Sequence, residues 1–345
     1  MHALPTEIRA GSSWRDVWRE VALTVALVVA INALVDRYLD IHPTNRAKAV
    51  VQAKWDLVRA PPKDLGWLVV GDSSANQGVD TRMLAAATHE AAINVATVGD
   101  FGVVGDAWML QALLAAGGHP KRIVMVHVAD VWVRGLEVLE RVVTRLRPPV
   151  DVARFEPPLA WSMRQKLHLA WNHHFVNRFP FYTQNDSLTW LLLNPGKILH
   201  PPQVRLDPSG FESEPETSPE LFAQDTPNLR KFMKGSSAEL TAHQLAALET
   251  VARLTRRLHA TLYIRPSPLW EGFAGDPAVQ PFVNHVADQL EHFAATHASV
   301  VLLTRDPFWL PATQLQNADH ATEEGARRFT QSTLDEILHR ERRAP

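Results

Sequence analysis

The first distinct pattern along the chain is an uninterrupted apolar run near its start. Residues 1–20 form a polar segment of mixed charge, whereas Val21 to Val35 contains no charged side chain. Aromatic residues at the edges of the run can extend it into a membrane interface. Because the run is apolar on all sides, it favours a membrane-spanning signal anchor over residues 21–38. A cleaved signal peptide and a buried core helix are the competing interpretations.

Beyond this run, apolar residues first take helical spacing and then alternate between strand and helix patterns. Residues 39–63 predict a juxtamembrane helix, which Pro61 and Pro62 end. Short β-branched runs predict five buried strands, at residues 67–70, 92–96, 122–128, 261–264 and 299–304. Amphipathic stretches predict helices at residues 81–87, 106–116, 238–259, 276–297 and 323–341. This alternation predicts an α/β domain over residues 64–345, with a doubly wound five-stranded parallel sheet in the order 2-1-3-4-5.

The alternation stops between about residues 130 and 240, where prolines and aromatic residues are frequent. Part of this segment has a helical pattern, for example residues 162–176, and the acidic, proline-rich residues 212–220 predict a mobile loop. We expect an insertion, largely helical or irregular, over the strand ends. It would be a lid, a surface for docking a partner, or a peripheral layer of no special function.

Composition and charge narrow the classes of function. The chain has 345 residues, a net charge of −2 and a pI of about 6.8, so nothing indicates binding to nucleic acid. The absence of cysteine excludes disulfides, thiolate metal sites and cysteine nucleophiles. No glycine-rich phosphate-binding motif is present, and His168, His173 and His174 lack metal-site spacing. We therefore expect neither a cofactor nor a metal.

The candidate chemistry begins where the first predicted strand ends. Gly71 permits a sharp turn into Asp72 and Ser73, which alone would be a capping turn of no chemical role. His320 lies in the loop between the fifth strand and the last helix. In a doubly wound sheet both loops open at the carboxyl edge, so the histidine can serve as a base for the serine.

Together, the Gly71-Asp72-Ser73 motif, the five βα units, and Asp319-His320 followed by Gly325-Ala326 resemble the SGNH (GDSL-like) hydrolase superfamily. With the N-terminal anchor, the chain looks like the membrane-anchored, extracytoplasmic branch that includes alginate O-acetylation proteins and the D-alanyl transfer protein of teichoic acid. The resemblance implies a serine acyltransferase or esterase that acts on a cell-surface polysaccharide or related polymer. It also implies a membrane-bound O-acyltransferase as partner and an inner-membrane protein whose main domain is periplasmic.

Carried over by resemblance, Ser73 is the nucleophile, His320 the general base, and Asp72 with the Ser73 N–H shapes the oxyanion site. The second block of the family would fall at Asn94 and at Gly99 or Gly102. After the fourth strand, Arg265 is positioned either to bind an anionic substrate group or to pair with a carboxylate.

Two departures from the family pattern bear on activity. The acid expected three residues before the histidine is Asn317, and Asp319 adjoins His320, where triad geometry is hard to reach. The Gly-x-Asn-Asp block is missing, so that donor would come from elsewhere, such as Asn76. These departures favour an alternative, a weak or inactive accessory protein of the same fold that docks a membrane O-acyltransferase. A soluble intracellular esterase would require the apolar run to be a core helix.

Overall fold

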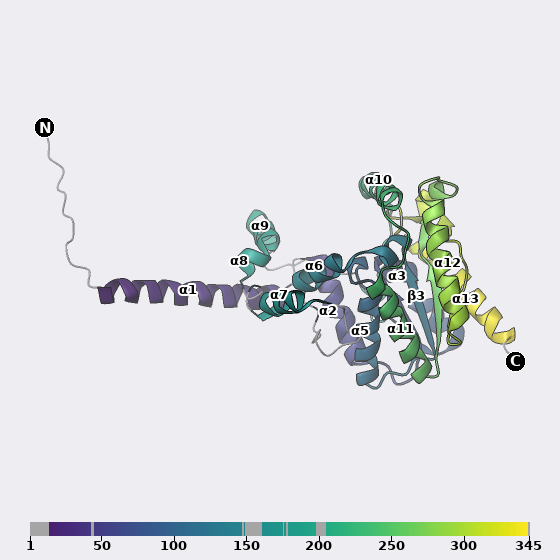
Figure 1. The fold of residues 1–345 in the computed structure, drawn as a ribbon, viewed down its shortest axis with the longest axis horizontal. Coiled ribbons are helices and arrows are strands. Elements are labelled where there is room, and N and C mark those ends of the chain that lie inside the picture. Colours follow the sequence, from purple (N-terminus) through teal and green to yellow (C-terminus); the bar gives the residue numbers. More distant parts are fainter. Residues whose placement is uncertain are drawn as a thin grey trace. The chain divides into compact units, whose positions relative to one another are not determined.

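The computed structural model describes residues 14–42, 45–146, 148, 161–174, 176, 179–197 and 205–343. The chain divides into two compact units, one formed by residues 1–44 with 167–202 and the other by residues 45–166 with 203–345. We describe each unit by itself (Figure 1).

The first unit contains the N-terminal apolar helix α1 (Trp14–Ile41). Its stretch Trp14–Leu39 has a mean hydropathy of 1.7 and is long and apolar enough to cross a membrane. The predicted apolar helix is thus confirmed, although it begins inside the segment that we expected to be polar. The unit also holds the end of α7 (Met163–His174), α8 (Pro180–Thr183), α9 (Asn185–Leu193) and the short η4 (Pro195–Lys197).

The second unit is built on a five-stranded, all-parallel sheet with the order β2-β1-β3-β4-β6. The strands are β1 (Leu65–Gly71), β2 (Ala91–Asn94), β3 (Arg122–His127), β4 (Thr261–Pro266) and β6 (Val300–Leu302). Every residue of β1 is buried, as expected for a central strand covered on both faces. The mixed α/β class and the parallel five-stranded sheet are confirmed.

Helices cover the sheet. They are α2 (Arg46–Arg59), α3 (Ser73–Gly78), α4 (Thr81–Thr88), α5 (Gly102–Ala115), α11 (Ala242–Arg257), α12 (Gln280–Thr296) and α13 (Glu323–Arg343). Phe329 and Ile337 of α13 pack with Trp67 and Val69 of β1 in one buried cluster. Helices α5 and α11 lie side by side (Figure 1). Helix α2 contacts α5 and belongs to this unit, because its apolar face is buried there.

The structure adds a two-stranded parallel sheet that the sequence pattern did not predict. It pairs β5 (Pro268–Trp270) with β7 (Phe308–Leu310). Strand β5 follows β4 in the chain but lies outside the main sheet, so the sheet continues from β4 to β6. The expected order 2-1-3-4-5 is therefore matched only in outline.

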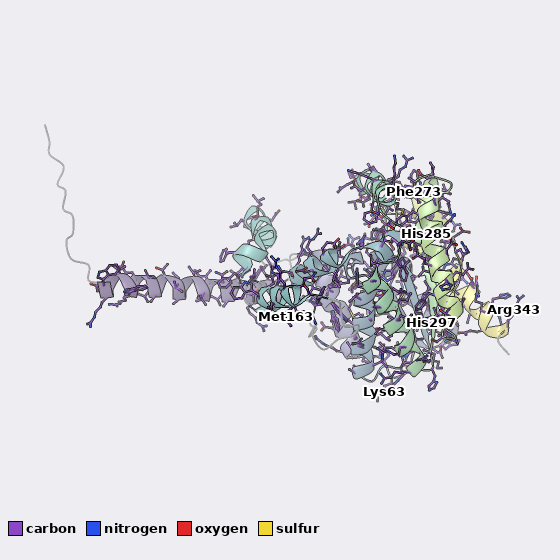
Figure 2. The ribbon with its side chains drawn as sticks, in the orientation of Figure 1. Lys63, Met163, Phe273, His285, His297 and Arg343 are labelled. Atoms are coloured by element: carbon purple, nitrogen blue, oxygen red, sulfur yellow. The ribbon has the colours of Figure 1, made fainter. Side chains whose placement is uncertain are left out.

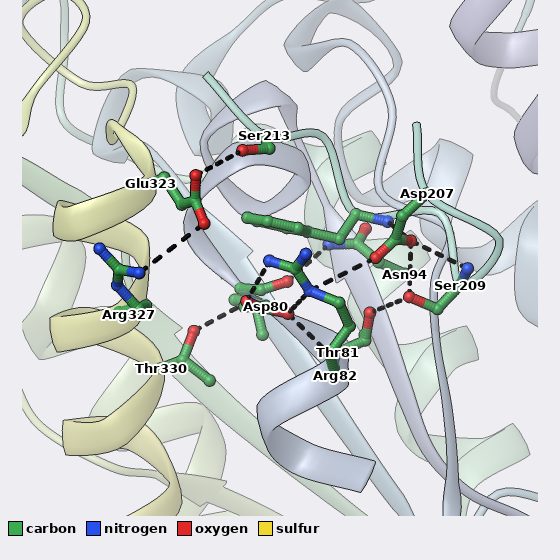
Figure 3. A network of polar contacts seen from close by, with 12 residues as sticks. Asp80, Thr81, Arg82, Asn94, Asp207, Ser209, Ser213, Glu323, Arg327 and Thr330 are labelled. Atoms are coloured by element: carbon green, nitrogen blue, oxygen red, sulfur yellow. Dashed lines mark hydrogen bonds and ion pairs between the residues drawn. The ribbon is translucent and has the colours of Figure 1, made fainter. Parts of the chain in front are cut away.

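The expected insertion contains more regular structure than its composition indicates. In addition to α7, the described residues form η2 (Ala129–Val133), α6 (Leu136–Leu146) and α10 (Pro219–Gly235). The segment before α10 is fixed by polar contacts: the hydroxyls of Thr81 and Ser209 lie 2.6 Å apart, and Asp207 accepts from Ser209 (Figure 3). These contacts hold the chain that leads into α10.

Glu212 departs from the mobile loop predicted over residues 212–220. Its side chain is 3% exposed, and its carboxylate accepts hydrogen bonds from Arg46 at 2.7 Å and from Asn76 at 2.6 Å. A buried acid is tolerated where a cation and an amide neutralise it. The pairing joins α2, α3 and the chain entering α10.

Candidate functional site

A cavity of about 370 Å³ lies where the strands of the main sheet end. Its wall combines the turn after β1, η1 (Gly99–Phe101), the chain after β3, α10 and the loop before α13. The polar residues that line it are Asp72, Ser73, Asp130, Arg134, Asp225, Asn228, Asn317, Asp319 and His320. Ser73 and His320, which are 247 positions apart in the sequence (320 − 73), thus share one cavity.

Ser73 is held by the turn between β1 and α3. Gly71 has a φ of 138°, and a Cβ there would lie 2.0 Å from the carbonyl oxygen of Val126, so only glycine fits. Asp72 then caps α3, because its carboxylate accepts from the N–H groups of Ser74 and Val128 at 2.8 Å each. Ser73 is the first residue of α3, and its hydroxyl has no hydrogen-bond partner among the described residues. The turn therefore fixes the serine backbone and leaves the hydroxyl available.

The imidazole of His320 is fixed through one of its two nitrogens. Nδ1 lies 2.8 Å from Asn317 Oδ1 and 2.7 Å from Asp319 Oδ1. In the part of the chain that the structure describes, Nε2 has no protein partner. A histidine held this way presents Nε2 to a substrate or nucleophile.

Asp319 lies closer to His320 than its adjacent position led us to expect, as an ion-pair contact at Nδ1, while the hydrogen bond of Nδ1 is to Asn317. The oxygen of Asn317 accepts the backbone N–H of both Asp319 and His320, at 3.2 and 2.8 Å. This side-chain turn curls the loop, and a bridge between Leu315 and Ala321 closes it. Adjacent side chains can therefore both approach Nδ1.

Asn317 has a second contact that explains an amide at this position. Its Nδ2 donates to Asp225 Oδ2 of α10 at 2.6 Å, while its oxygen accepts from the His320 loop. An amide can donate and accept at once, whereas an ionised carboxylate only accepts. Asn317 thus links α10 to the histidine loop.

The charges around His320 favour its protonated form. Burial alone would lower the pKa of His320, but the negative charge and hydrogen bond of Asp319, with the charges of Asp72 and Asp225, raise it above its ordinary value. The histidine is therefore a stronger base than a free imidazole, and it is neutral only at higher pH.

A buried ionic cluster lies directly behind the serine turn. His127 Nε2 is 2.6 Å from Asp106 Oδ2, and its Nδ1 is 3.5 Å from Asp72 Oδ2. Trp132 packs edge-on against the ring. Burial alone would lower the pKa of His127, but Asp106 and then Asp72 raise it to about 10. At neutral pH the imidazolium of His127 therefore pairs with Asp106, and its charge lies close to Asp72, which caps the serine helix.

His127 and Asp106 are not among the candidate residues selected from the sequence. A histidine inside a buried strand and Asp106 inside the otherwise apolar α5 were the available signals, because buried charges need partners.

Arg134 is a second residue that sequence analysis did not select. Its guanidinium lies 2.7 Å from Asp130 and 2.7 Å from Asp100. A Cβ on Gly99 would lie 2.9 Å from Arg134 Nη1, so the glycine leaves room for this side chain at the cavity wall. Burial raises the pKa of Asp130, and the charge of Arg134 opposes that shift.

Two asparagines predicted to belong to the oxyanion or substrate-binding site, Asn76 and Asn94, form hydrogen bonds elsewhere. Asn76 donates to Glu212, and its carbonyl accepts the N–H of the same residue. Asn94 is fully buried and donates to the carbonyls of Ala75 and Val79. Neither lines the cavity.

Gly102 and Arg265 also lie away from the cavity lining. A Cβ on Gly102 would meet the amide of Gln244 at 2.2 Å, so that glycine is covered by α11. Arg265 pairs with Glu336 of α13 at 2.7 Å. Of the two interpretations left open for Arg265, its contacts match the carboxylate pair.

Comparison with known proteins does not assign the chain to a family. No family model matches the chain, and no curated protein matches it. Within the described residues no three His, Asp or Glu side chains are grouped to hold a metal ion. A function for this protein is therefore inferred from the arrangement of Ser73, His320, Asn317 and Asp319.

Proposed function

We propose that this protein is a membrane-anchored serine acyltransferase or esterase of the SGNH type, with a flavodoxin-like sheet. It would act on a cell-surface polysaccharide or related polymer through an acyl-Ser73 intermediate. The observation that carries the proposal is a single cavity lined by Ser73, whose hydroxyl is unpaired within the described residues, and by His320, whose Nδ1 is held.

The proposed chemistry begins when the Ser73 hydroxyl attacks the carbonyl carbon of an acyl donor. His320 Nε2 accepts the hydroxyl proton, and Asp319 stabilises the imidazolium that forms. When the tetrahedral intermediate collapses, His320 returns the proton to the leaving oxygen. An acceptor hydroxyl or water then attacks the carbonyl carbon of acyl-Ser73 and gives its proton to His320. When this second intermediate collapses, His320 returns the proton to the Ser73 oxygen, and the acylated acceptor or free acid leaves.

Developing negative charge on the carbonyl oxygen needs hydrogen-bond donors. The Ser73 N–H lies in the first turn of α3, where N–H groups have no acceptor inside the helix. Asp72 shapes this turn as an acceptor of two N–H bonds. Gly99 lies on the same cavity wall and is the remaining candidate from the second block.

The membrane part of the proposal is supported by α1, which is apolar enough to span a bilayer. An anchor of this kind would keep the enzyme at the inner membrane with its main unit in the periplasm. It would also bring the enzyme close to a membrane-bound O-acyltransferase, the proposed source of the acyl group.

The proposal is tested with a fluorophosphonate probe, which reacts with activated serines. We expect labelling of wild type, none of Ser73→Ala, and labelling of His320→Ala slowed by about 100-fold or more. Ser74→Ala is the matched control, because Ser74 is the next residue and its buried hydroxyl has no partner in the described chain. Labelling that persists in Ser73→Ala would refute the assignment. Failure of the folded wild type to react would favour an accessory protein that docks the acyltransferase.

A further inference from the structure

A row of exposed apolar side chains runs along α7. Met163, Leu167 and Trp171 are 70%, 64% and 58% exposed, and their four-residue spacing puts them on one side of the helix. Met163 is labelled on this helix in Figure 2. Exposed apolar rows of this kind mark a surface that another apolar phase covers.

The chain that follows α7 exposes apolar residues in the same way. Phe179 and Phe181 are 42% and 54% exposed around the start of α8, and Leu192 and Leu193 at the end of α9 are 81% and 76% exposed. We call residues 163–193 the apolar arm. Its concentration of large exposed side chains is unusual for a surface in contact with water.

The apolar arm carries a positive net charge. It contains Arg164, Lys166 and Arg178 against a single acid, Asp186. Arg164 and Lys166 are exposed on α7, next to the apolar row. Cationic side chains beside an apolar face suit a bilayer surface, because their stems lie along the apolar phase while their charges reach phosphate headgroups.

Residues 167–193 of the apolar arm belong to the same compact unit as α1. Helix α8 contacts α1, and both belong to the same compact unit. Among the α1 side chains that the structure describes, the buried ones are Asn32, Asp36 and Leu39, in the last turns of the helix. Asp36 is also the first charge after the apolar run, so this is the end of α1 at which a hydrocarbon layer would stop if α1 crosses a membrane.

We propose that the apolar arm lies in the interface of the bilayer that α1 spans. Its exposed aromatic and aliphatic side chains enter the boundary between headgroups and acyl chains, and Arg164 and Lys166 contact anionic headgroups. Interfacial helices of this composition place their apolar face about 5–10 Å into that boundary. The inference depends on α1 crossing the membrane and is independent of the Ser73 chemistry.

The test uses the full-length chain in vesicles of phosphatidylcholine and phosphatidylglycerol, with no other protein present. Because the chain has no cysteine, Leu167→Cys and Leu192→Cys each create a unique site for a nitroxide spin label. Leu245→Cys is the control, since Leu245 is 41% exposed on α11 of the α/β unit. Collision rates with oxygen, which concentrates in lipid, are compared with those of a water-soluble nickel complex.

We expect labels at 167 and 192 to favour oxygen over the nickel complex by several-fold relative to the label at 245. The proposal would be overturned if the labels at 167 and 192 collided with the nickel complex as often as the control label at 245 does. If they became shielded only in native membranes, the apolar arm would bind a membrane protein instead of lipid. Because the readout does not use activity, an inactive enzyme would leave this result unaffected.

Discussion

Replacing Asn317 by aspartate would introduce the acid that the resemblance to SGNH enzymes leads one to expect at this position, yet we expect the replacement to damage this protein. Asn317 Nδ2 lies 2.6 Å from a carboxylate oxygen of Asp225. In Asn317→Asp, that donor becomes an oxygen, and two carboxylates face each other. The half-buried position of Asp225 and the burial of Asn317 limit screening by water.

The size of the effect follows from the distance. At 2.6 Å, two unit charges repel by about 6 kcal/mol if the effective dielectric constant is about 20. The pair can avoid this repulsion by binding one proton, shared between the two carboxylates. At pH 7 that protonation costs about 4 kcal/mol, less than the repulsion, because the ordinary pKa of aspartate is about three units below pH 7. The loss in unfolding free energy is therefore capped at about 4 kcal/mol at pH 7 and falls to about 1.5 kcal/mol at pH 5. The folded carboxylate pair of the variant has a raised pKa, so the stability of the variant decreases as pH rises.

The assay is urea unfolding at pH 5 and pH 7, together with the rate of fluorophosphonate labelling. The matched variant is the exchange Asn317→Asp with Asp225→Asn, which returns one amide and one carboxylate to the pair. We expect the exchange to recover most of the lost stability and to label at a rate similar to wild type, because the carboxylate at 317 can then accept from His320. An Asn317→Asp protein as stable as wild type at pH 7 would refute the proposed link between α10 and the histidine loop.

Three further predictions concern the site and its support. Asp319→Asn removes the charge that most raises the pKa of His320, so the acidic limb of the labelling rate should move to lower pH. A limb that stays in place would show that Asp319 does not set this pKa. Asp106→Asn should reduce the loss of stability between about pH 6.5 and 10, since the raised pKa of His127 stabilises the fold below that range and ceases to do so as the ring deprotonates. Equal slopes of melting temperature against pH in wild type and variant would contradict this coupling. Gly71→Ala should lower stability by at least about 3 kcal/mol, because a Cβ would strain the backbone and clash with the carbonyl oxygen of Val126 in the neighbouring strand β3. A melting temperature like that of wild type would exclude this clash.

The sheet could be predicted because its strands carry strong local signals. Runs such as Ile123 to Val126 are β-branched or apolar throughout, and helical periodicity separates them. The pair β5 and β7 could not be found this way, because three-residue strands beginning at Pro268 and Phe308 carry no periodicity of their own. Their pairing is a consequence of tertiary contact.

The histidine site could be predicted in position but not in geometry. The spacing of Asn317, Asp319 and His320 is visible in the sequence, whereas the turn that brings both oxygens to Nδ1 depends on backbone hydrogen bonds. The contact of Asp225 with Asn317 could not be predicted either, because Asp225 lies in the insertion, which was expected to be largely helical or irregular without a helix assigned at this position. Long-range partners of buried polar groups are the part that a pattern of residue types does not encode.

The most direct test of the central claim is the location of the acyl group on the protein. Wild type would be incubated with p-nitrophenyl acetate, quenched in acid and digested with trypsin, which releases residues 64–82 by cleavage after Lys63 and Arg82. Fragmentation mass spectrometry should place one acetyl group on Ser73, retain it in Ser74→Ala and find none in Ser73→Ala. An equal burst of nitrophenol from Ser73→Ala, or an acetyl group on another residue, would contradict the proposed function.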